Sequence, residues 1–275
     1  MHMVLTTYLQ RLAFAALLCW LAPACVQAEP IPVRHVQGSL HGFLSVRTVE
    51  GRLIAMGDVS QIVHGDRVTA HVAFHFKDGS LDEETAVFSQ RRTFQLISDH
   101  HIQRGPFFPH PLDMTIDARS GLVTVRTTGK DGKEEVDSEH MKLPPDLVNG
   151  LTFVAAINIA PDAPATSVSM VVSTPKPRLI KIVFTPRGEE PFSVAGFERK
   201  AMHFDMKIDL GGIAGIVAPL IGKQPPDLGA WVFDSEAPVL VRLIGYLFLG
   251  GPALTFEPTG TVWPQSPDSR LVSPK

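Results

Sequence analysis

Hydrophobic and polar positions alternate along residues 201–210, which read AMHFDMKIDL. Met202, Phe204, Met206 and Ile208 therefore lie on one face of a predicted β-strand, and His, Asp and Lys side chains lie on the other. The apolar face could pack in a sealed core, face a lipid bilayer, or line a cavity that holds a hydrophobic molecule. The alternation itself does not choose among these three.

Short alternating runs, separated by turn residues, recur along most of the chain and predict antiparallel hairpins. Val72, Phe74 and Phe76, for example, share one face of a predicted strand that ends in a hairpin turn at residues 77–79. A weak boundary near residues 160–166 separates two β-rich halves, which we expect to form one continuous sheet. Strands are expected in residues 42–57 (two), 68–76, 84–98 (one long strand), 113–138 (up to three), 165–173, 177–186, 201–210 and 229–258 (two or three).

Two segments break the alternation and are expected to be helical. Residues 144–161 begin with prolines, offer Asp146 as a helix cap and bunch their apolar residues, so we expect a helix near residues 145–158. Residues 211–222 are apolar on every side, which favours a buried or lid-like helix. The pattern as a whole predicts a mainly β (α+β) fold: a curved antiparallel sheet or open β-barrel with one or two helices packed on the concave face.

The start of the chain has the pattern of a secretory signal peptide. One positive charge, Arg11, precedes an apolar stretch, and small residues lead to a cleavage site after Ala28. Both cysteines lie in this leader, so the processed chain would carry no thiol and no disulfide. We expect a signal peptide over residues 1–28, a single β-rich domain over 29–260 and a flexible C-terminal tail over 261–275, in a periplasmic or secreted protein.

The sequence gives little reason to expect association with nucleic acids or insertion into a membrane. Lys and Arg total 25 and Asp and Glu total 28, for a net charge of −3, so no basic surface is indicated. No transmembrane span is predicted in the processed chain, because a span needs roughly 20 apolar residues. Acylation of Cys25 is an alternative to simple cleavage, although Ala22 occupies the position where the lipobox of bacterial lipoproteins usually has Leu.

Histidine is the abundant residue type with catalytic or metal-binding chemistry, with 11 in the chain. His100 and His101 would point to opposite faces of an extended strand, and no metal-binding spacing occurs within one segment. A metal site would have to combine distant segments, with Asp99, His100, His101 and His110 as the group to consider. We predict no catalytic residues, no metal ligands and no cofactor.

The motifs of common hydrolases and nucleotide-binding proteins are incomplete. GSLHG at residues 38–42 lacks the G-x-S-x-G elbow, and LIGKQ at 220–224 lacks the first glycine and the Ser or Thr of a phosphate loop. The acidic pairs at residues 83–84, 134–135 and 189–190 lie beside glycines or in turns. We interpret them as solvated hairpin ends rather than as paired catalytic carboxylates.

The last third of the chain carries more apolar surface than one sheet face needs, so a cavity is a hypothesis that stands beside a plain core. Methionine is flexible and polarizable and suits a wall that adapts to an irregular apolar ligand. A lipid-facing barrel would need aromatic girdles, but the chain has two Tyr and three Trp. A sealed core remains the alternative. The residues expected to line a cavity are Met202, Phe204, Met206, Ile208, Ile213, Ile216, Trp231 and Phe248.

The stretch GGIAGIVAPLIGKQPPDLGAWVF, with the later GGP, resembles the C-terminal part of uncharacterised exported bacterial proteins of unknown function. KDGSLDEETAVFSQRRTFQLISD and LPPDLVNGL are similar to the same group, so the resemblance covers most of residues 35–258. It implies no particular activity. In architecture, the expected fold resembles open β-barrels of the lipoprotein-carrier kind, whose concave face binds acyl chains and is closed by helices.

These observations favour a non-catalytic periplasmic protein that binds or carries a hydrophobic, lipid-like ligand, or that assists envelope assembly. The expected partner is a hydrophobic small molecule or lipid. One alternative is an exported hydrolase with a histidine-based, possibly metal-dependent site. Another is a structural or interaction protein with a sealed core. The sequence specifies neither the ligand nor the oligomeric state.

Overall fold

The computed structural model describes residues 29–128, 133–173, 176–194, 197–209 and 228–259, which form a mainly β fold. Within these residues, one antiparallel sheet of 14 strands contains every strand, and the short helix α2 accompanies it. The elements are β1 (Leu40–Thr48), β2 (Leu53–His64), β3 (Arg67–Phe76), β4 (Leu81–Gln90), β5 (Phe94–Arg104), β6 (Leu112–Asp117), β7 (Leu122–Thr128), β8 (Glu134–His140), α2 (Thr152–Asn158), β9 (Thr166–Ser173), β10 (Pro177–Val194), β11 (Phe197–Asp209), β12 (Leu228–Phe233), β13 (Val239–Gly245) and β14 (Leu254–Pro258).

Neighbouring strands of the sheet are consecutive in the chain, with one exception. The order is β8-β7-β6-β5-β4-β3-β2-β1-β14-β13-β12-β11-β10-β9, so β1 and β14 meet in the middle. Val46 pairs with Phe256 and Thr48 with Leu254 at this junction. We name β1–β8 the N-terminal wing and β9–β14 the C-terminal wing. The chain passes from one wing to the other through α2, and the two halves form one continuous sheet, as predicted.

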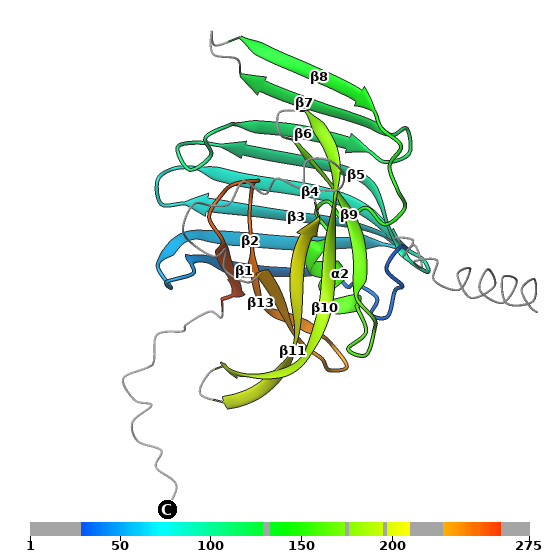
Figure 1. Cartoon of the computed structure of the whole chain (residues 1–275), viewed down its shortest axis with the longest axis vertical. Helices are drawn as coiled ribbons and strands as arrows, with labels where there is room; N and C mark the ends of the chain where they lie inside the picture. The colour runs from blue at the N-terminus through cyan, green and yellow to red at the C-terminus, as the bar shows by residue number, and fades with distance from the viewer. Residues whose placement is uncertain (1–28, 129–132, 174–175, 195–196, 210–227, 260–275) are drawn as a thin grey trace, which may run out of the picture.

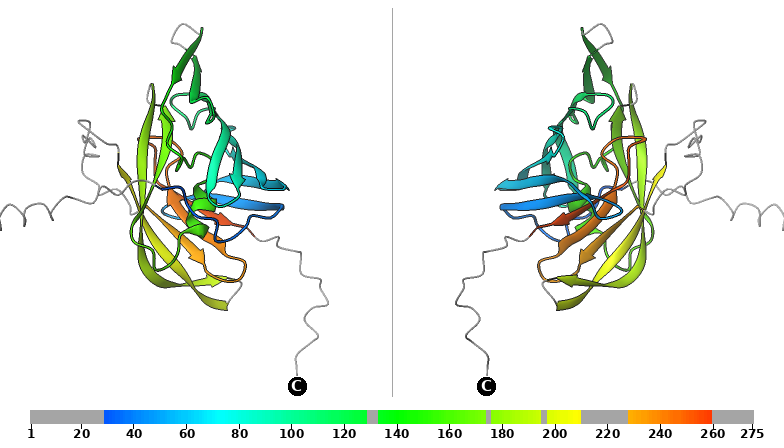
Figure 2. Two further views of the ribbon diagram at one scale, coloured as in Figure 1. Left: turned by 90° about the vertical axis from the view of Figure 1, so that its right-hand side faces the viewer. Right: turned by 90° about the vertical axis from the view of Figure 1, so that its left-hand side faces the viewer.

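The sheet curves so strongly that its two wings face each other. Figure 1 shows strands of the C-terminal wing crossing in front of the N-terminal wing, and Figure 2 shows the wings as two walls with α2 between them. α2 contacts β12 and β13 from the concave side. The strands β8 and β9 are the two ends of the sheet, so it is not closed into a barrel. The predicted fold class, a curved antiparallel sheet with a helix on its concave face, is confirmed.

The alternation of side chains decides which residues face the concave side. On β3, Phe74 is buried and His75 is exposed, and the strand is followed by a turn in which Gly79 has a φ of +86°. Glycine adopts this left-handed conformation without the cost that a side chain would add. On β11, Phe204 is buried and Lys207 is exposed, which confirms the strand predicted from AMHFDMKIDL.

Two local predictions differ from the structure. Residues 84–98 were expected to form one strand but belong to β4 and β5, because the chain turns at residues 91–93, where two arginines extend into solvent. The helix predicted within residues 144–161 is restricted to α2. Asp146 does not cap this helix; its Oδ2 atom accepts a hydrogen bond from Ser169 Oγ at 2.9 Å and thereby holds the edge strand β9.

Several predictions concern residues outside the described part of the chain. These are the signal peptide over residues 1–28, the apolar helix over 211–222 and the tail over 261–275. In the part of the chain that the structure describes, no helix has the length and apolar character needed to cross a membrane.

Candidate functional site

Four phenylalanines join the two wings at one end of the concave face. Phe107 and Phe108, in the loop after β5, contact Phe76 of β3 and Phe248, in the loop after β13, with ring centroids 4.4–6.0 Å apart. Gln103 Nε2 adds a polar contact, because it donates to the carbonyl of the residue before Phe248 at 2.8 Å. Aromatic pairs of this kind bury large areas and are individually stabilising. We name these four rings the aromatic cluster.

The segment before α2 covers the concave face at another level. The side chain of Asn149 exchanges two hydrogen bonds with the backbone of Val171, at 2.8 and 2.9 Å. Gly150 follows with a φ of +64°, and a Cβ atom there would lie 2.4 Å from Ala86 Cβ and 3.1 Å from Asp99 Oδ1. The backbone therefore passes directly over β4 and β5, and only glycine fits at this crossing.

Between these two contacts, a line of inner-face residues crosses five strands. We name Gly42, Val59, Val72, Glu84 and His101 the inner row; each is the cross-strand partner of the next, from β1 to β5. All five remain partly exposed although they face the concave side. The adjacent row, toward the aromatic cluster, is buried throughout: Leu44, Gly57, Phe74, Asp82 and Gln103.

The charged end of the inner row belongs to a cluster on β4 and β5. Asp82 Oδ2 accepts hydrogen bonds from Gln103 Nε2 at 2.6 Å and from His101 Nε2 at 3.2 Å. Asp99 interacts with Glu84 and is 3% exposed, and among the described residues no amide, hydroxyl or basic group donates a hydrogen bond to either of its carboxylate oxygens. The cluster thus combines a bonded ion pair with a buried carboxyl, Asp99, that lacks such a donor.

Burial and mutual interaction change the ionisation of these groups. Desolvation, followed by the charge of Glu84, raises the pKa of Asp99 well above its usual value. Desolvation also raises the pKa of Glu84, although His101 acts in the opposite direction. Burial alone would lower the pKa of His101, but the carboxylates of Asp82 and Glu84 outweigh it and raise the pKa to about 10. At neutral pH His101 is therefore charged, and burial side by side disfavours the ionisation of Glu84 and Asp99 together.

The predicted cavity residues on β11 share one face, as the alternation indicated. Phe204 is 1% exposed and Met206 is 7% exposed, and both belong to the hydrophobic core. Met202, two residues before Phe204, and Ile208, next to the last residue of the strand, are partly buried. In this conformation the middle of β11 offers its side chains to the core between the wings rather than to an open surface.

Trp231 lies on the opposite, outer face of the sheet from Phe204. It is the cross-strand partner of His203, and the two rings stack with centroids 4.2 Å apart. Its Nε1 atom donates to Glu190 Oε2 at 2.8 Å, and Arg242 lies over the indole at 5.7 Å. Hydrogen bonds from Trp231 and His203 lower the pKa of Glu190. The structure therefore does not bring Trp231 together with the other predicted cavity residues.

Of the remaining predicted cavity residues, one belongs to the aromatic cluster and two lie outside the described residues. Phe248 is partly buried and belongs to the aromatic cluster, where it contacts Phe107 and Phe108. Ile213 and Ile216 lie outside the described residues.

The candidate metal group is not brought together. His100 Nε2 contacts Asp113 Oδ1 at 3.0 Å on the outer face, whereas His101 faces the concave side, so the two point apart as expected. His110 is exposed in the loop between β5 and β6, away from the inner-face position of Asp99. Within the described ranges, no group of three or more His, Cys, Asp or Glu side chains could hold a metal ion.

The interpretation of residues 83–84 as a solvated acidic pair is wrong for one of them. Glu83 does face outward, where it contacts His71 Nε2 at 3.0 Å. Glu84 faces the concave side, because it shares the inner face of β4 with Ala86 and Phe88, both of which are buried. The period-two pattern of β4 contained this signal, and it would have placed a carboxylate on the face of a buried phenylalanine.

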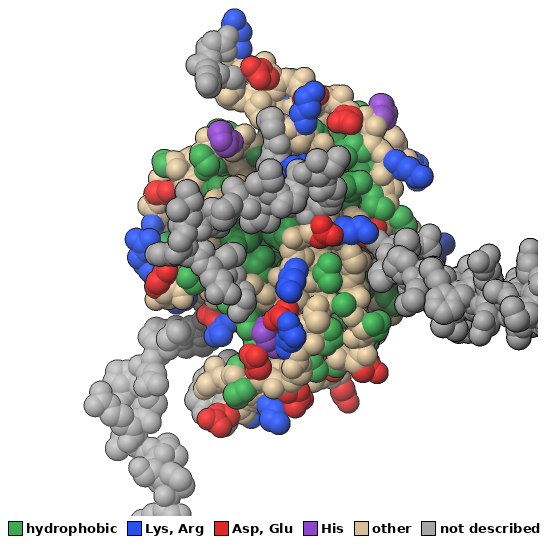
Figure 3. All heavy atoms as spheres, viewed as in Figure 1, with side chains coloured by type: hydrophobic (Ala, Val, Ile, Leu, Met, Phe, Trp, Pro, Cys, Tyr) green, Lys and Arg blue, Asp and Glu red, His purple; other side chains and the backbone are tan. Residues whose placement is uncertain are grey.

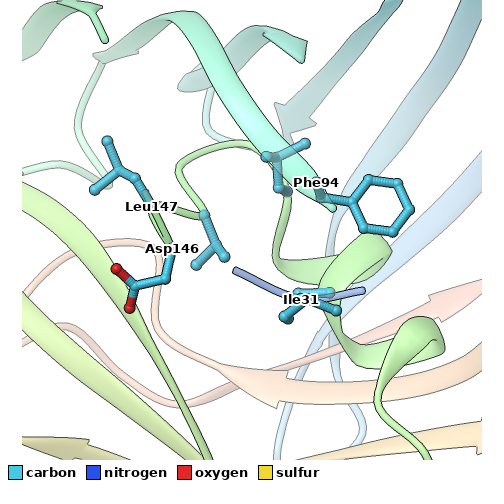
Figure 4. Close-up of a pocket in the computed structure, with 7 residues that line it drawn as sticks. Ile31, Phe94, Asp146 and Leu147 are labelled. Carbon is cyan, nitrogen blue, oxygen red and sulfur yellow. The ribbon is translucent and has the colours of Figure 1, made fainter. Parts of the chain in front are cut away.

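Two hollows elsewhere in the described structure do not suit a large apolar ligand. One, of about 10 Å³, lies between Ile31, Phe94 and the segment at Leu147 (Figure 4). That volume corresponds to a single water molecule. The other, of about 420 Å³, is an open depression over β4, β5, β6 and the start of β7, and its lining mixes polar residues such as Thr85, Asp99 and His100 with apolar ones such as Val87 and Leu122.

Comparison with known proteins identifies no family and no function for this chain. No family model matches the chain, and no curated protein matches it in sequence. A similar solved structure is the β-barrel-like protein of a domain of unknown function (DUF1849) from Brucella abortus, with 6% sequence identity and a TM-score of 0.41, covering 80% of this chain and 94% of that one. At this identity and TM-score the similarity carries no information on function. Export, ligand binding and localisation therefore stay predictions.

Proposed function

We propose that this chain is a non-catalytic protein of the periplasm, or a secreted protein, that binds or carries a hydrophobic, lipid-like ligand on the concave face of its sheet. The observation that supports the proposal is the inner row. Its apolar members, Val59 and Val72, face the concave side and remain partly exposed, while the adjacent row from Leu44 to Phe74 is buried. A sealed core would bury both rows alike.

The energetic reason is the cost of leaving apolar surface in contact with water. Burial of apolar surface contributes roughly 25 cal/mol per Å², so a ligand that covers partly exposed valines is bound by the same force that packs the core. Figure 3 shows hydrophobic side chains between the two wings on the face that Figure 1 presents. Because β8 and β9 end the sheet without pairing to each other, the concave side is not enclosed by a closed barrel.

The proposed wall differs from the one expected from the sequence. Phe204 and Met206 of β11 are packed in the core, so their role is to support the site from the opposite wing. The contact surface is contributed by β1 to β5 instead. Affinity would come from apolar area, with the few polar groups at the end of the row fixing the orientation of the ligand.

A fluorescence titration with the neutral apolar probe N-phenyl-1-naphthylamine tests the proposal. We expect the probe to brighten on binding to the purified protein, and the substitution Val59→Trp, which fills the inner row, to weaken binding at least tenfold. Ile62→Trp is the matched control, because Ile62 lies on the same strand but on the outer face, 55% exposed. Absence of probe binding, or an equal effect of the two substitutions, contradicts the proposal.

A further inference from the structure

The inner row changes from apolar to charged along its length. Val59 and Val72 provide hydrocarbon, and the next two members, Glu84 and His101, provide a carboxyl and an imidazole. A ligand that lies along the row would therefore contact an apolar wall first and a polar group at one end. This order of contacts matches an amphiphile with a hydrocarbon tail and a polar head.

The two halves of the charged cluster have different roles. Asp82 is bonded to His101 and Gln103, and Gln103 also bonds to the loop after β13, so this half ties the two wings together. Glu84 and Asp99 form the other half. The backbone N–H of Gly150 hydrogen-bonds Glu84. The Asp82 half stabilises the fold, and the other half has carboxyl oxygens that could accept further hydrogen bonds.

Buried carboxyl oxygens without a hydrogen-bond donor lower the stability of the fold unless a ligand supplies the donor. Asp99 is 97% removed from solvent, and no amide, hydroxyl or basic group in the described part of the chain donates to either oxygen. An unsatisfied buried polar group costs about 1–3 kcal/mol, and more when it is charged. Glu84 is the partly exposed member of the pair, so a donor that binds along the inner row would contact Glu84 first. Its effect on Asp99 would be transmitted by the interaction between the two carboxyls.

The surrounding charges favour a positive ligand. His101 and Asp82 form an ion pair, and Glu84 and Asp99 lie beside it, so the cluster contains three carboxyl groups and one imidazole. The flanking strands contribute Val72 and Met114 at the same level, and α2, with the sequence TFVAAIN, has no charged side chain. The described neighbours of the pair therefore provide no further cation, while charge-assisted hydrogen bonds to a carboxylate are about twice as strong as neutral ones.

We infer that Glu84 and Asp99 form the head-group site for an amphiphile that carries a protonated amine, with its hydrocarbon tail along Val59 and Val72. This inference rests on the proposed function. The ammonium donates N–H bonds to Glu84, and its positive charge favours the ionised form of both carboxyls.

Displacement of the same neutral probe by three amphiphiles with equal twelve-carbon tails tests the head-group site. Dodecylammonium, dodecanol and dodecanoate are compared below their micelle concentrations, with circular dichroism as a check that the fold is kept. We expect dodecylammonium to bind at least tenfold more tightly than dodecanol, and dodecanoate to bind least well.

Three substitutions locate the effect. Glu84→Gln and Asp99→Asn remove the charge with little change in shape, and each should bring the three amphiphiles to within about threefold of one another. Glu83→Gln, on the outer face of the same strand, should keep the full preference.

The outcomes separate the two proposals. Equal binding of all three amphiphiles to the unmodified protein overturns the head-group site and leaves hydrophobic binding intact. A preference that survives both inner substitutions, or that is lost in Glu83→Gln, also overturns it. Failure of the probe itself to bind overturns the proposed function.

Discussion

The charge on His101 makes a testable contribution to stability. Its pKa is raised to about 10 in the folded protein by the carboxylates of Asp82 and Glu84, against an ordinary value of 6.5. Between these two values the folded chain keeps a proton that the unfolded chain releases. The stabilisation is therefore complete below about pH 6.5 and is lost as the pH rises toward 10. Glu84 and Asp99, whose pKa values are also raised, act in the same direction.

The magnitude follows from the size of the change. The interval from 6.5 to about 10, at about 1.36 kcal/mol per pH unit, sets a ceiling of roughly 5 kcal/mol for His101. The side chain is 15% exposed, so solvent screens part of its interaction with Asp82. We expect the free energy of unfolding to fall by about 2–4 kcal/mol between pH 6.5 and pH 10.

Urea unfolding at a series of pH values, followed by circular dichroism, measures this change. His101→Gln should be less stable than the unmodified protein at pH 6 and should lose more than half of the slope. His100→Gln is the matched control, because His100 lies on the same strand, is exposed and pairs with Asp113 on the outer face. A stability that does not change between pH 6.5 and pH 10, or a slope that His101→Gln retains, would refute the reasoning.

Three further predictions concern packing and the edges of the sheet. Gly150→Ala should lower the free energy of unfolding by about 2–4 kcal/mol, because its Cβ would collide with β4. Gly188 also has a positive φ but has open space around it, so Gly188→Ala should lower the free energy of unfolding by only about 1 kcal/mol. Urea unfolding compares the two variants. Phe108→Ala, at 3% exposure in the aromatic cluster, should cost about 3–5 kcal/mol in the same assay. Replacing Glu135 and Asp137 of the exposed end strand β8 by Val should cause self-association, visible by light scattering, because edge charges oppose strand pairing between molecules.

The sequence predicted the sheet well because its information is local. Alternation of period two fixed the faces of β3 and β11, and turn residues such as those near Gly51 and Gly79 marked the hairpins correctly. The long run at residues 84–98 was predicted as one strand because its alternation continues on both sides of the turn. Only the pairing of β4 with β5, which is not local information, shows that the chain reverses there.

The site was less predictable because it depends on curvature. The sequence shows that Phe204 and Val72 each lie on an apolar face of a strand. It does not show which of these two faces packs against the opposite wing. Trp231 illustrates the same limit: its strand was predicted, yet the register with His203 places it on the outer face. Glu84 could have been found, since its spacing from Phe88 places both on one face.

Native mass spectrometry of the protein taken directly from its cells, without detergent, tests the central claim most directly. If the inner row binds a hydrophobic molecule, a fraction of the protein carries an added mass that organic solvent extracts, and Val59→Trp abolishes it while Ile62→Trp does not. Protein that carries no added mass in repeated preparations, or an adduct equally present in both variants, would contradict a ligand site on the concave face.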